Sequence, residues 1–240
     1  MAAERLARVL ALLVEGGDTD PGVTRLCQVC ASATHTSGAM IMLGSPEAPL
    51  GSWCSADEVS LLMEEAQYTL GEGPCIDAYN LERPVVEPDL VEPDKARWPS
   101  FSPVVLQSGA RAVFGFPLRI GAVRLGALGL HRNKPGPLTD DEHADALVVA
   151  DVATRAVLTL QTNASPSEIA TEIATGANLR LMVHQACGMV AVQLGISLTE
   201  ALIRLRARAF ADDRPIAAVV GDIVARRLRF DPNSREVRKE

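Results

Sequence analysis

The chain has 240 residues, of which 48 % are hydrophobic and 22 % are charged. This composition supports a buried core and excludes an intrinsically disordered protein. The length allows one large domain, or a medium domain followed by a small one. No run of about 18 apolar residues occurs without a charge, so we expect no membrane span.

The N-terminal segment and the cysteines indicate a cytoplasmic protein. An acidic residue, Glu4, stands in the first turn, and no basic segment followed by an apolar block precedes the rest of the chain. We therefore expect no secretory signal. The five cysteines are an odd number scattered through a chain of ordinary size, which predicts reduced thiols.

The net charge of −7 is unevenly distributed. Residues 176–230 contain eight arginines, no lysine and four acids, a net charge of +4. Residues 1–175 have a net charge of −11. An acidic body repels nucleic acid, so any contact with nucleic acid must come from the basic region. An ordinary solvated surface is the alternative explanation for the arginines.

The first 160 residues alternate between helical and strand patterns. Helical spacing of apolar residues predicts helices at Ala2–Val14, Pro21–Ala33, Asp57–Leu70, Ile76–Leu81 and Thr139–Leu158. Short apolar runs predict strands at Gly38–Leu43, Leu50–Cys54, Arg83–Glu87, Ala112–Ile120 and Leu125–Arg132. Val91–Ser102 reads as a loop. The pattern is that of an α+β fold with an antiparallel sheet between helices.

A second, all-helical region follows a break at Asn163–Pro166. We expect a first domain at 1–162, a linker at 163–177, a three-helix domain at 178–230 and a tail at 231–240. The first of the three helices spans Leu179–Leu194. The second begins after Ser197, with Glu200 completing a capping box, and the third begins at Arg214-Pro215.

Several segments of this second region resemble the ANTAR domain, a three-helix RNA-binding module of bacterial transcription antitermination regulators. The matching segments are Ala186–Val190, Leu194–Ser197, Glu200–Leu202, Leu205-Arg206, Ala209 and Ile216–Val220. Tyr68–Cys75 and Asp77–Tyr79 resemble the GAF domains that precede ANTAR in actinobacterial regulators. The resemblance implies binding to RNA stem-loops, so that a terminator does not form. It also implies control by homodimerisation or by a small-molecule or protein signal at the GAF-like domain.

The sequence departs from the ANTAR pattern in its first helix. His184 stands where an acid is expected, and Cys187 where a lysine is expected. The candidate RNA contacts are then the arginines of the module: Arg180, Arg204, Arg206, Arg208 and Arg214. Arg204 and Arg208 are one turn apart, away from the apolar stripe of their helix, where guanidinium groups reach phosphates or stack on bases.

Other interpretations of the basic module remain open. In one of them the module is a dimerisation or protein-docking domain with degenerate RNA binding, as the missing lysine suggests. DNA binding by a helix-turn-helix is another, although a third helix rich in Ile, Ala and Val is poorly suited to base edges. Phe210 offers a stacking surface, but an aromatic residue at that spacing is more typical of a helix core.

The first domain shows candidate pocket residues and no catalytic motif. The pocket candidates are Met40, Met42, Trp53, Cys75, Phe114 and Phe116, and the alternative is that they fill a core. Cys27 and Cys30 share one helix face as Cys-x-x-Cys, which suggests a redox pair or half a metal site, but Val23, Leu26 and Val29 make core packing the simpler explanation. We expect no cofactor, no metal and no enzymatic activity.

Overall fold

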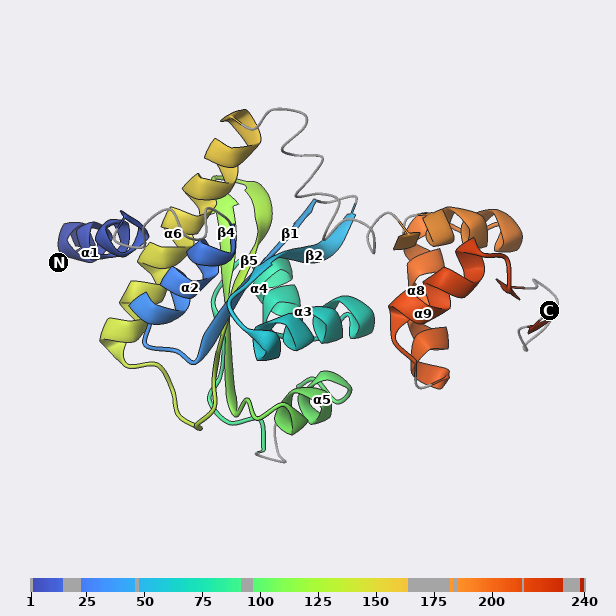
Figure 1. The fold of residues 1–240 in the computed structure, drawn as a ribbon, viewed down its shortest axis with the longest axis horizontal. Coiled ribbons are helices and arrows are strands. Elements are labelled where there is room, and N and C mark those ends of the chain that lie inside the picture. The colour runs from blue at the N-terminus through green and yellow to red at the C-terminus, as the bar shows by residue number, and fades with distance from the viewer. Residues whose placement is uncertain are drawn as a thin grey trace. The chain divides into compact units, whose positions relative to one another are not determined.

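The computed structural model describes residues 2–14, 23–45, 48–91, 97–163, 182–183, 185–212, 214–230 and 238–239. The chain divides into two compact units, Met1–Asn163 and Ala164–Glu240. Figure 1 shows an α+β unit built on an antiparallel sheet, and a helical unit. The expected linker at 163–177 lies almost entirely outside the described residues, as does most of the tail.

The larger unit is organised around a five-stranded sheet with the order β2-β1-β5-β4-β3. Every neighbouring pair is antiparallel. The strands are β1 (Gly38–Ser45), β2 (Ala48–Ser55), β3 (Val85–Glu87), β4 (Ala112–Ile120) and β5 (Val123–Arg132). All five strands predicted from the sequence are present, because each is a short β-branched or apolar run bounded by turn residues.

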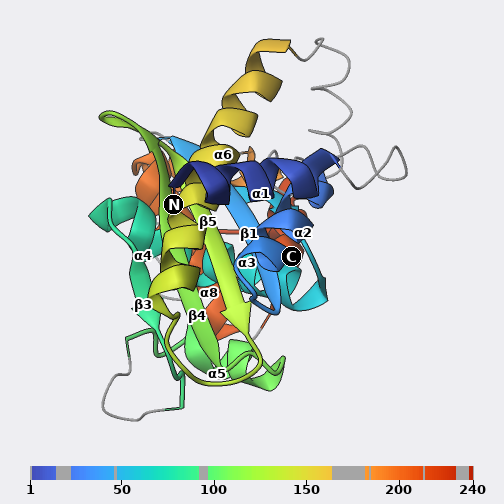
Figure 2. The same ribbon diagram turned by 90° about the vertical axis from the view of Figure 1, so that its left-hand side faces the viewer.

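One face of the sheet is covered by α2 (Val23–Ala33) and α6 (Asp140–Asn163), and α1 (Ala2–Val14) packs on these two helices. Figure 2 shows α1, α2 and α6 on the same side. Their apolar sides pack on a core that includes Ile41, Phe114 and Leu128. Arg5 of α1 donates to the carboxylate of Asp145 on α6 over 2.6 Å, which joins the two helices at the domain surface.

The opposite face carries α3 (Glu58–Leu70), α4 (Pro74–Leu81) and α5 (Phe101–Gln107). Helix α4 begins two residues earlier than predicted, because Pro74 occupies the first turn, where a missing N–H costs nothing. The first two residues of helix α5, Phe101 and Ser102, lie in the segment that the sequence predicts as a loop, so the loop prediction is wrong for these two residues. The N-terminal amides of α5 receive no local side-chain cap from Ser100.

Local capping explains where two of the long helices begin. Asp57 accepts a hydrogen bond from the Ser60 amide at 2.9 Å and starts α3. At α6 the exchange is reciprocal, since the Glu142 amide donates to Thr139 Oγ1 and the Thr139 amide donates to Glu142 Oε2. This is a capping box, and it confirms Thr139 as the predicted cap.

The smaller unit contains three described helical segments: Gln185–Leu194, α8 (Leu198–Ala211) and α9 (Ile216–Val224). Gly195 adopts φ 66° after the first of these, the left-handed conformation that favours glycine at a helix end. Ser197 accepts from the Glu200 amide at 3.2 Å, as the sequence predicts. Two short strands, β6 (Leu228–Arg229) and β7 (Arg238–Lys239), pair after the helices. The sequence does not predict either strand: β6 lies at the end of the predicted three-helix domain, and β7 lies in the predicted tail.

A pair of glycines lets α4 lie directly on the sheet. Gly115 and Gly129 are directly opposite each other on β4 and β5. A Cβ on Gly115 would lie 2.2 Å from the carbonyl oxygen of Pro74, and one on Gly129 would lie 2.7 Å from Cys75 Sγ. No real Cβ makes such contacts, so only glycine permits this close approach of helix and sheet.

A second long-range contact ties the end of β5 to the start of α3. His131 Nε2 lies 3.3 Å from Asp57 Oδ1, and His131 is 1 % exposed. Burial lowers the pKa of His131 below its ordinary value of 6.5, and the attraction of Asp57 does not compensate fully. The native state therefore favours the neutral imidazole.

We predict that Gly115→Ala destabilises the larger unit by about 1–3 kcal/mol, the usual range for overpacking a tight contact. The obstacle is backbone, so a side-chain rotation cannot relieve it. Urea unfolding followed by circular dichroism measures the change. Gly188→Ala, at a helical position with open space around it, is the matched control and should not lower stability. Equal effects of the two substitutions would contradict this account of α4.

We predict that acidification below about pH 6.5 destabilises the protein partly through His131. The unfolded chain binds a proton there that the folded chain resists, so the free energy of unfolding falls as pH decreases. One proton corresponds to at most about 1.4 kcal/mol per pH unit. Urea unfolding between pH 7.5 and pH 5 should show a shallower dependence in His131→Asn. His35→Asn, at an exposed position with φ 51°, should keep the wild-type slope.

Candidate functional site

Three of the six predicted pocket residues lie together on the sheet face beneath α3 and α4. Gln67 Nε2 is 3.5 Å from Met40 Sδ, and the space above Gly129 is bounded by both Met40 and Cys75. Met42 points to the same face, two residues along β1 from Met40. All three are fully buried, so within the described chain they are packed side chains rather than a solvent-open surface.

The other three predicted pocket residues lie on the opposite face. Phe114 and Phe116 belong to the core beneath α2 and α6, and Trp53 packs against it. The ring of Phe116 lies 5.4 Å from that of His143 on α6. The structure therefore splits the predicted pocket set in two, because alternate residues of a strand point to opposite faces.

Gln67 is a central residue of the α3–α4 face that the sequence does not reveal. It is fully buried, and its Oε1 accepts from the Cys75 amide at 2.8 Å. This bond holds the start of α4 against α3. Gly73 has φ 131°, and a Cβ there would lie 2.5 Å from Gln67 Cγ. The predicted turn Leu70–Cys75 is therefore fixed both by its glycines and by the side chain of Gln67.

The same turn also caps α5. Glu72 Oε2 accepts from the backbone amides of Ser100 and Phe101 at 2.9 and 3.2 Å. A carboxylate at a helix N-terminus satisfies unpaired amides and favours the helix dipole. Because the capping residue lies 28 residues upstream, no pattern close to α5 in the sequence predicts where this helix begins. Trp98 completes the contact by donating to Asp77 at 3.2 Å.

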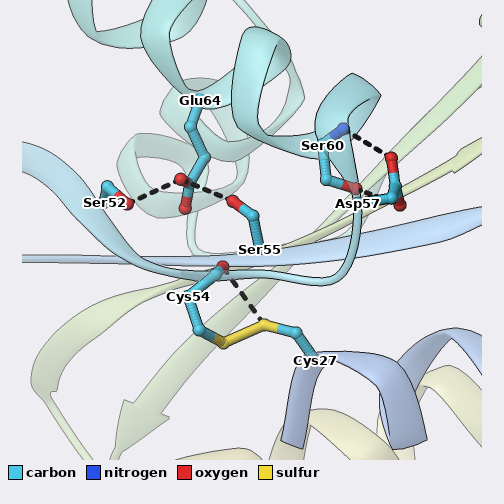
Figure 3. Close-up of a disulfide and its surroundings, with 7 residues drawn as sticks. All are labelled: Cys27, Ser52, Cys54, Ser55, Asp57, Ser60 and Glu64. Atoms are coloured by element: carbon cyan, nitrogen blue, oxygen red, sulfur yellow. Dashed lines mark hydrogen bonds between the residues drawn. A yellow bond between two sulfur atoms is a disulfide. The ribbon is translucent and has the colours of Figure 1, made fainter. Parts of the chain in front are cut away.

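A buried carboxylate links α3 to β2, as Figure 3 shows. Glu64 is 1 % exposed, and its Oε2 accepts from Ser52 and Ser55 at 2.6 and 2.7 Å. Hydrogen bonds from two hydroxyls offset the cost of burying this polar group. The apolar repeat of α3 predicts the helix but carries no signal for this polar contact with the sheet.

The structure corrects the expectation of five reduced thiols. Cys27 of α2 forms a disulfide with Cys54 of β2. Cys30, Cys75 and Cys187 are free and buried. Cys27 and Cys30 are both buried in the core, as the simpler explanation of their spacing expects, and they do not form the alternative redox pair with each other. The Cys27 side chain points to the sheet and meets an edge strand instead, a pairing that the spacing in sequence does not reveal.

Some arginines of the smaller unit form ion pairs with carboxylates, and others form none in the described part of the chain. Arg208 is paired with Asp212 at 2.7 Å, and Arg214 with Asp222 at 2.7 Å. Arg204 is exposed and has no ion pair within the described residues, and the same holds for Arg226 and Arg229, which are not among the predicted contacts. Arg180 and His184 lie outside the described residues.

Arg206 lies near the position where the ANTAR-like pattern lacks its lysine. Burial raises the pKa of the Cys187 thiol, and the positive charge of Arg206 opposes that rise. The guanidinium of Arg206 is therefore close enough to Cys187 to influence the pKa of its thiol. A cation from α8 is thus present near Cys187.

The solvent side of α8 is partly apolar. Ala201, Leu202, Leu205 and Ala209 are buried, as the predicted stripe requires. Phe210 is 67 % exposed and Ile203 is 57 % exposed, so the expectation of a core position for Phe210 is wrong. At about 100° per residue, Ile203 and Phe210 fall on one line of the helix, and Arg204 flanks that line. A cation and an aromatic ring are therefore both presented to solvent by α8.

Metal-binding and membrane-spanning sites find no support in the described ranges. No group of three or more His, Cys, Asp or Glu side chains there is placed to hold a metal ion. No single helix among these residues is long and apolar enough to cross a membrane, and the one helix pair that qualifies in combination is bent by 101°.

Comparison with known proteins identifies the larger unit. The model of the GAF domain matches residues 18–157. Among solved structures, the GAF domain of a phosphoenolpyruvate-protein phosphotransferase from Coxiella burnetii has 11 % identity and a TM-score of 0.47, covering 67 % of this chain and 96 % of that one. The equivalent domain from Acinetobacter has 12 % identity and a TM-score of 0.48, with coverages of 68 % and 96 %.

A GAF domain/HD domain protein from Geobacter sulfurreducens is also similar, with 14 % identity, a TM-score of 0.43 and coverages of 60 % and 94 %. No curated protein matches the chain. The match of the GAF model extends over more than half of the 240 residues, from before α2 to near the end of α6. GAF domains are signal-sensing modules, and this chain belongs to the GAF domain family.

Proposed function

We propose that the chain is a non-catalytic, signal-responsive regulator that binds RNA stem-loops through its C-terminal helices and so controls transcription termination in the cytoplasm. The GAF domain receives the signal, from a small molecule or a protein, and a homodimer is the expected working form. The observation that carries the RNA proposal is the solvent side of α8, which exposes both Arg204 and the ring of Phe210.

The chemistry of that surface fits a single-stranded RNA loop. Guanidinium groups neutralise phosphates, and aromatic rings stack on bases that a loop leaves unpaired. Residues 176–230 have a net charge of +4, while residues 1–175 have a net charge of −11. The electrostatic attraction for RNA is therefore concentrated on the smaller unit, and the acidic body disfavours non-specific contacts.

A second function, protein docking or dimerisation, is favoured by a different observation. Apolar side chains of the smaller unit are unusually exposed for a helical surface, with Val192 at 86 %, Ile203 at 57 % and Phe210 at 67 %. Such residues are typical of contacts between proteins. Gel shifts with short RNA hairpins and matched DNA hairpins separate the two functions, because a docking module binds neither and forms a stable dimer.

We predict that replacing Arg204 and Arg208 by alanine weakens RNA binding and flattens its salt dependence. The slope of log K against log salt should shrink by about 0.7 for each phosphate that is no longer neutralised, and so by about 1.4 for two. Arg204→Ala alone should account for at least half of this change, because Arg208 is already paired with Asp212. Fluorescence anisotropy over a salt series measures the slope.

The matched control is Arg155→Ala on α6. Arg155 forms the same kind of helical ion pair, with Asp151, at 2.9 Å, but it belongs to the acidic GAF domain. Its loss should leave the salt slope unchanged. An unchanged slope in the Arg204/Arg208 variant would remove those residues from the RNA interface.

We predict that Phe210→Leu weakens hairpin binding by about 1–3 kcal/mol, the usual contribution of one stacked base, without changing the salt slope. Leucine keeps the apolar surface and lacks the flat ring. Phe210→Trp should retain binding. If the surface serves dimerisation instead, the wild-type protein does not bind the hairpin, and Phe210→Leu changes only the stability of the dimer, which sedimentation measures.

A further inference from the structure

The disulfide between Cys27 and Cys54 joins two elements that already pack together. Helix α2 contacts both β1 and β2, and its apolar side lies in the main core. Disulfides are needed mainly in small secreted domains whose cores are too small to fold alone. The unit Met1–Asn163 has a core of ordinary size. The crosslink is therefore not required to complete an insufficient core, which leaves room for a role in function.

The position of Cys54 depends on an irregularity in β2. Ile41 of β1 is opposite Cys54, while the next residue, Met42, is opposite Ser52. Trp53 is thus an extra residue in the edge strand, a β-bulge that redirects side chains. As a result Trp53 and Cys54 face the α2 side, whereas Ser52 and Ser55 face α3. At a bulge the ladder of backbone hydrogen bonds is locally disrupted.

The two sides of this bulged segment carry different contacts, which Figure 3 shows together. On one side Cys54 is bonded to Cys27 of α2. On the other, Ser52 and Ser55 donate to Glu64 of α3. Glu64 is buried, so loss of either hydroxyl removes a hydrogen bond from a carboxyl group that water does not reach. A movement of β2 at Cys54 therefore changes the hydrogen bonds that Ser52 and Ser55 donate to α3.

We propose that Cys27 and Cys54 form a reversible oxidation site through which the GAF domain senses thiol oxidants of the peroxide class and dithiol reductants. This inference rests on the GAF domain alone and holds whether or not the C-terminal helices bind RNA. The bulge of β2 carries the change from the sulfur pair to Glu64 and α3.

The chemistry balances with one peroxide for each crosslink. The Cys54 thiolate attacks the O–O bond, giving a sulfenic acid and one water after proton transfer. Cys27 then attacks the Cys54 sulfur, the S–S bond forms, and a second water leaves. Two electrons pass from the sulfurs to the peroxide. A dithiol reductant reverses the change by attack on Cys54, which at 6 % exposure is more accessible than the fully buried Cys27.

The surroundings accommodate both forms of the pair. Cys27 Sγ lies 3.1 Å from the carbonyl oxygen of Cys54, so a thiol formed by reduction has a hydrogen-bond acceptor at hand. The neighbouring Cys30 is not part of the crosslink. It is a free, buried thiol, and burial raises its pKa to about 12.

The test uses the full-length protein, equilibrated without denaturant in glutathione buffers from oxidising to reducing, then alkylated and mapped by peptide mass spectrometry. The proposal requires an intermediate oxidised fraction of Cys27–Cys54 within this range, and re-formation of the crosslink with hydrogen peroxide. A crosslink that stays complete in the most reducing buffer is structural, and that result would overturn the proposal. So would a pair that peroxide leaves reduced.

Hydrogen exchange tests the coupling. Amides of β2 and of the first turns of α3 should exchange at least about tenfold faster in the reduced protein. Cys27→Ser, whose hydroxyl can donate to the same carbonyl, should show the reduced pattern under all buffers. Cys30→Ala, a buried neighbour on the same helix, should respond like the wild type. Identical exchange of β2 and α3 in both forms of the wild type would show that the pair transmits nothing.

Discussion

Burial of the five-stranded sheet on both faces is the constraint on which the rest of the GAF domain depends. Each strand must supply side chains to two cores, so the direction of every residue is decided by its place in the alternation. The bulge at Trp53 is the point where β2 breaks that alternation. It turns Cys54 toward α2 while Ser52 and Ser55 reach Glu64 on the other side. Contacts to both helical layers therefore originate from four consecutive residues.

Most of the secondary structure is predictable because its signals are local. The apolar repeats of α1, α3 and α6 and the capping residues Asp57 and Thr139 lie within or next to the segments that they define. Helix α5, in contrast, is capped by Glu72 from a distant turn. The position where α5 begins depends on a tertiary contact, so it cannot be predicted from the residues close to it in the sequence. The short pairing of β6 with β7 also joins residues about ten apart, and each of these strands has only two residues, too few for a strand pattern to show in the sequence.

The candidate sites are less predictable, because they depend on which face a side chain occupies and on what it meets there. Five of the six pocket candidates lie on strands and Cys75 lies in the first turn of α4, yet Phe114 and Phe116 face away from Met40. Similarly, the sequence alone does not distinguish the arginines from one another. In the structure Arg208 and Arg214 form ion pairs with carboxylates, whereas Arg204 is exposed. Formal charge therefore overstates the cationic surface that the smaller unit offers to a partner.

The two margins of the sheet carry one further consequence. Strand β3 has only three residues and lies between Pro84 and Pro88, and β2 contains Pro49. Proline has no N–H to donate, so neither margin presents a continuous row of donors to another strand. The disulfide at Cys54 also holds the β2 margin against its own domain. Both features disfavour pairing of either margin with a strand from another copy of the GAF domain.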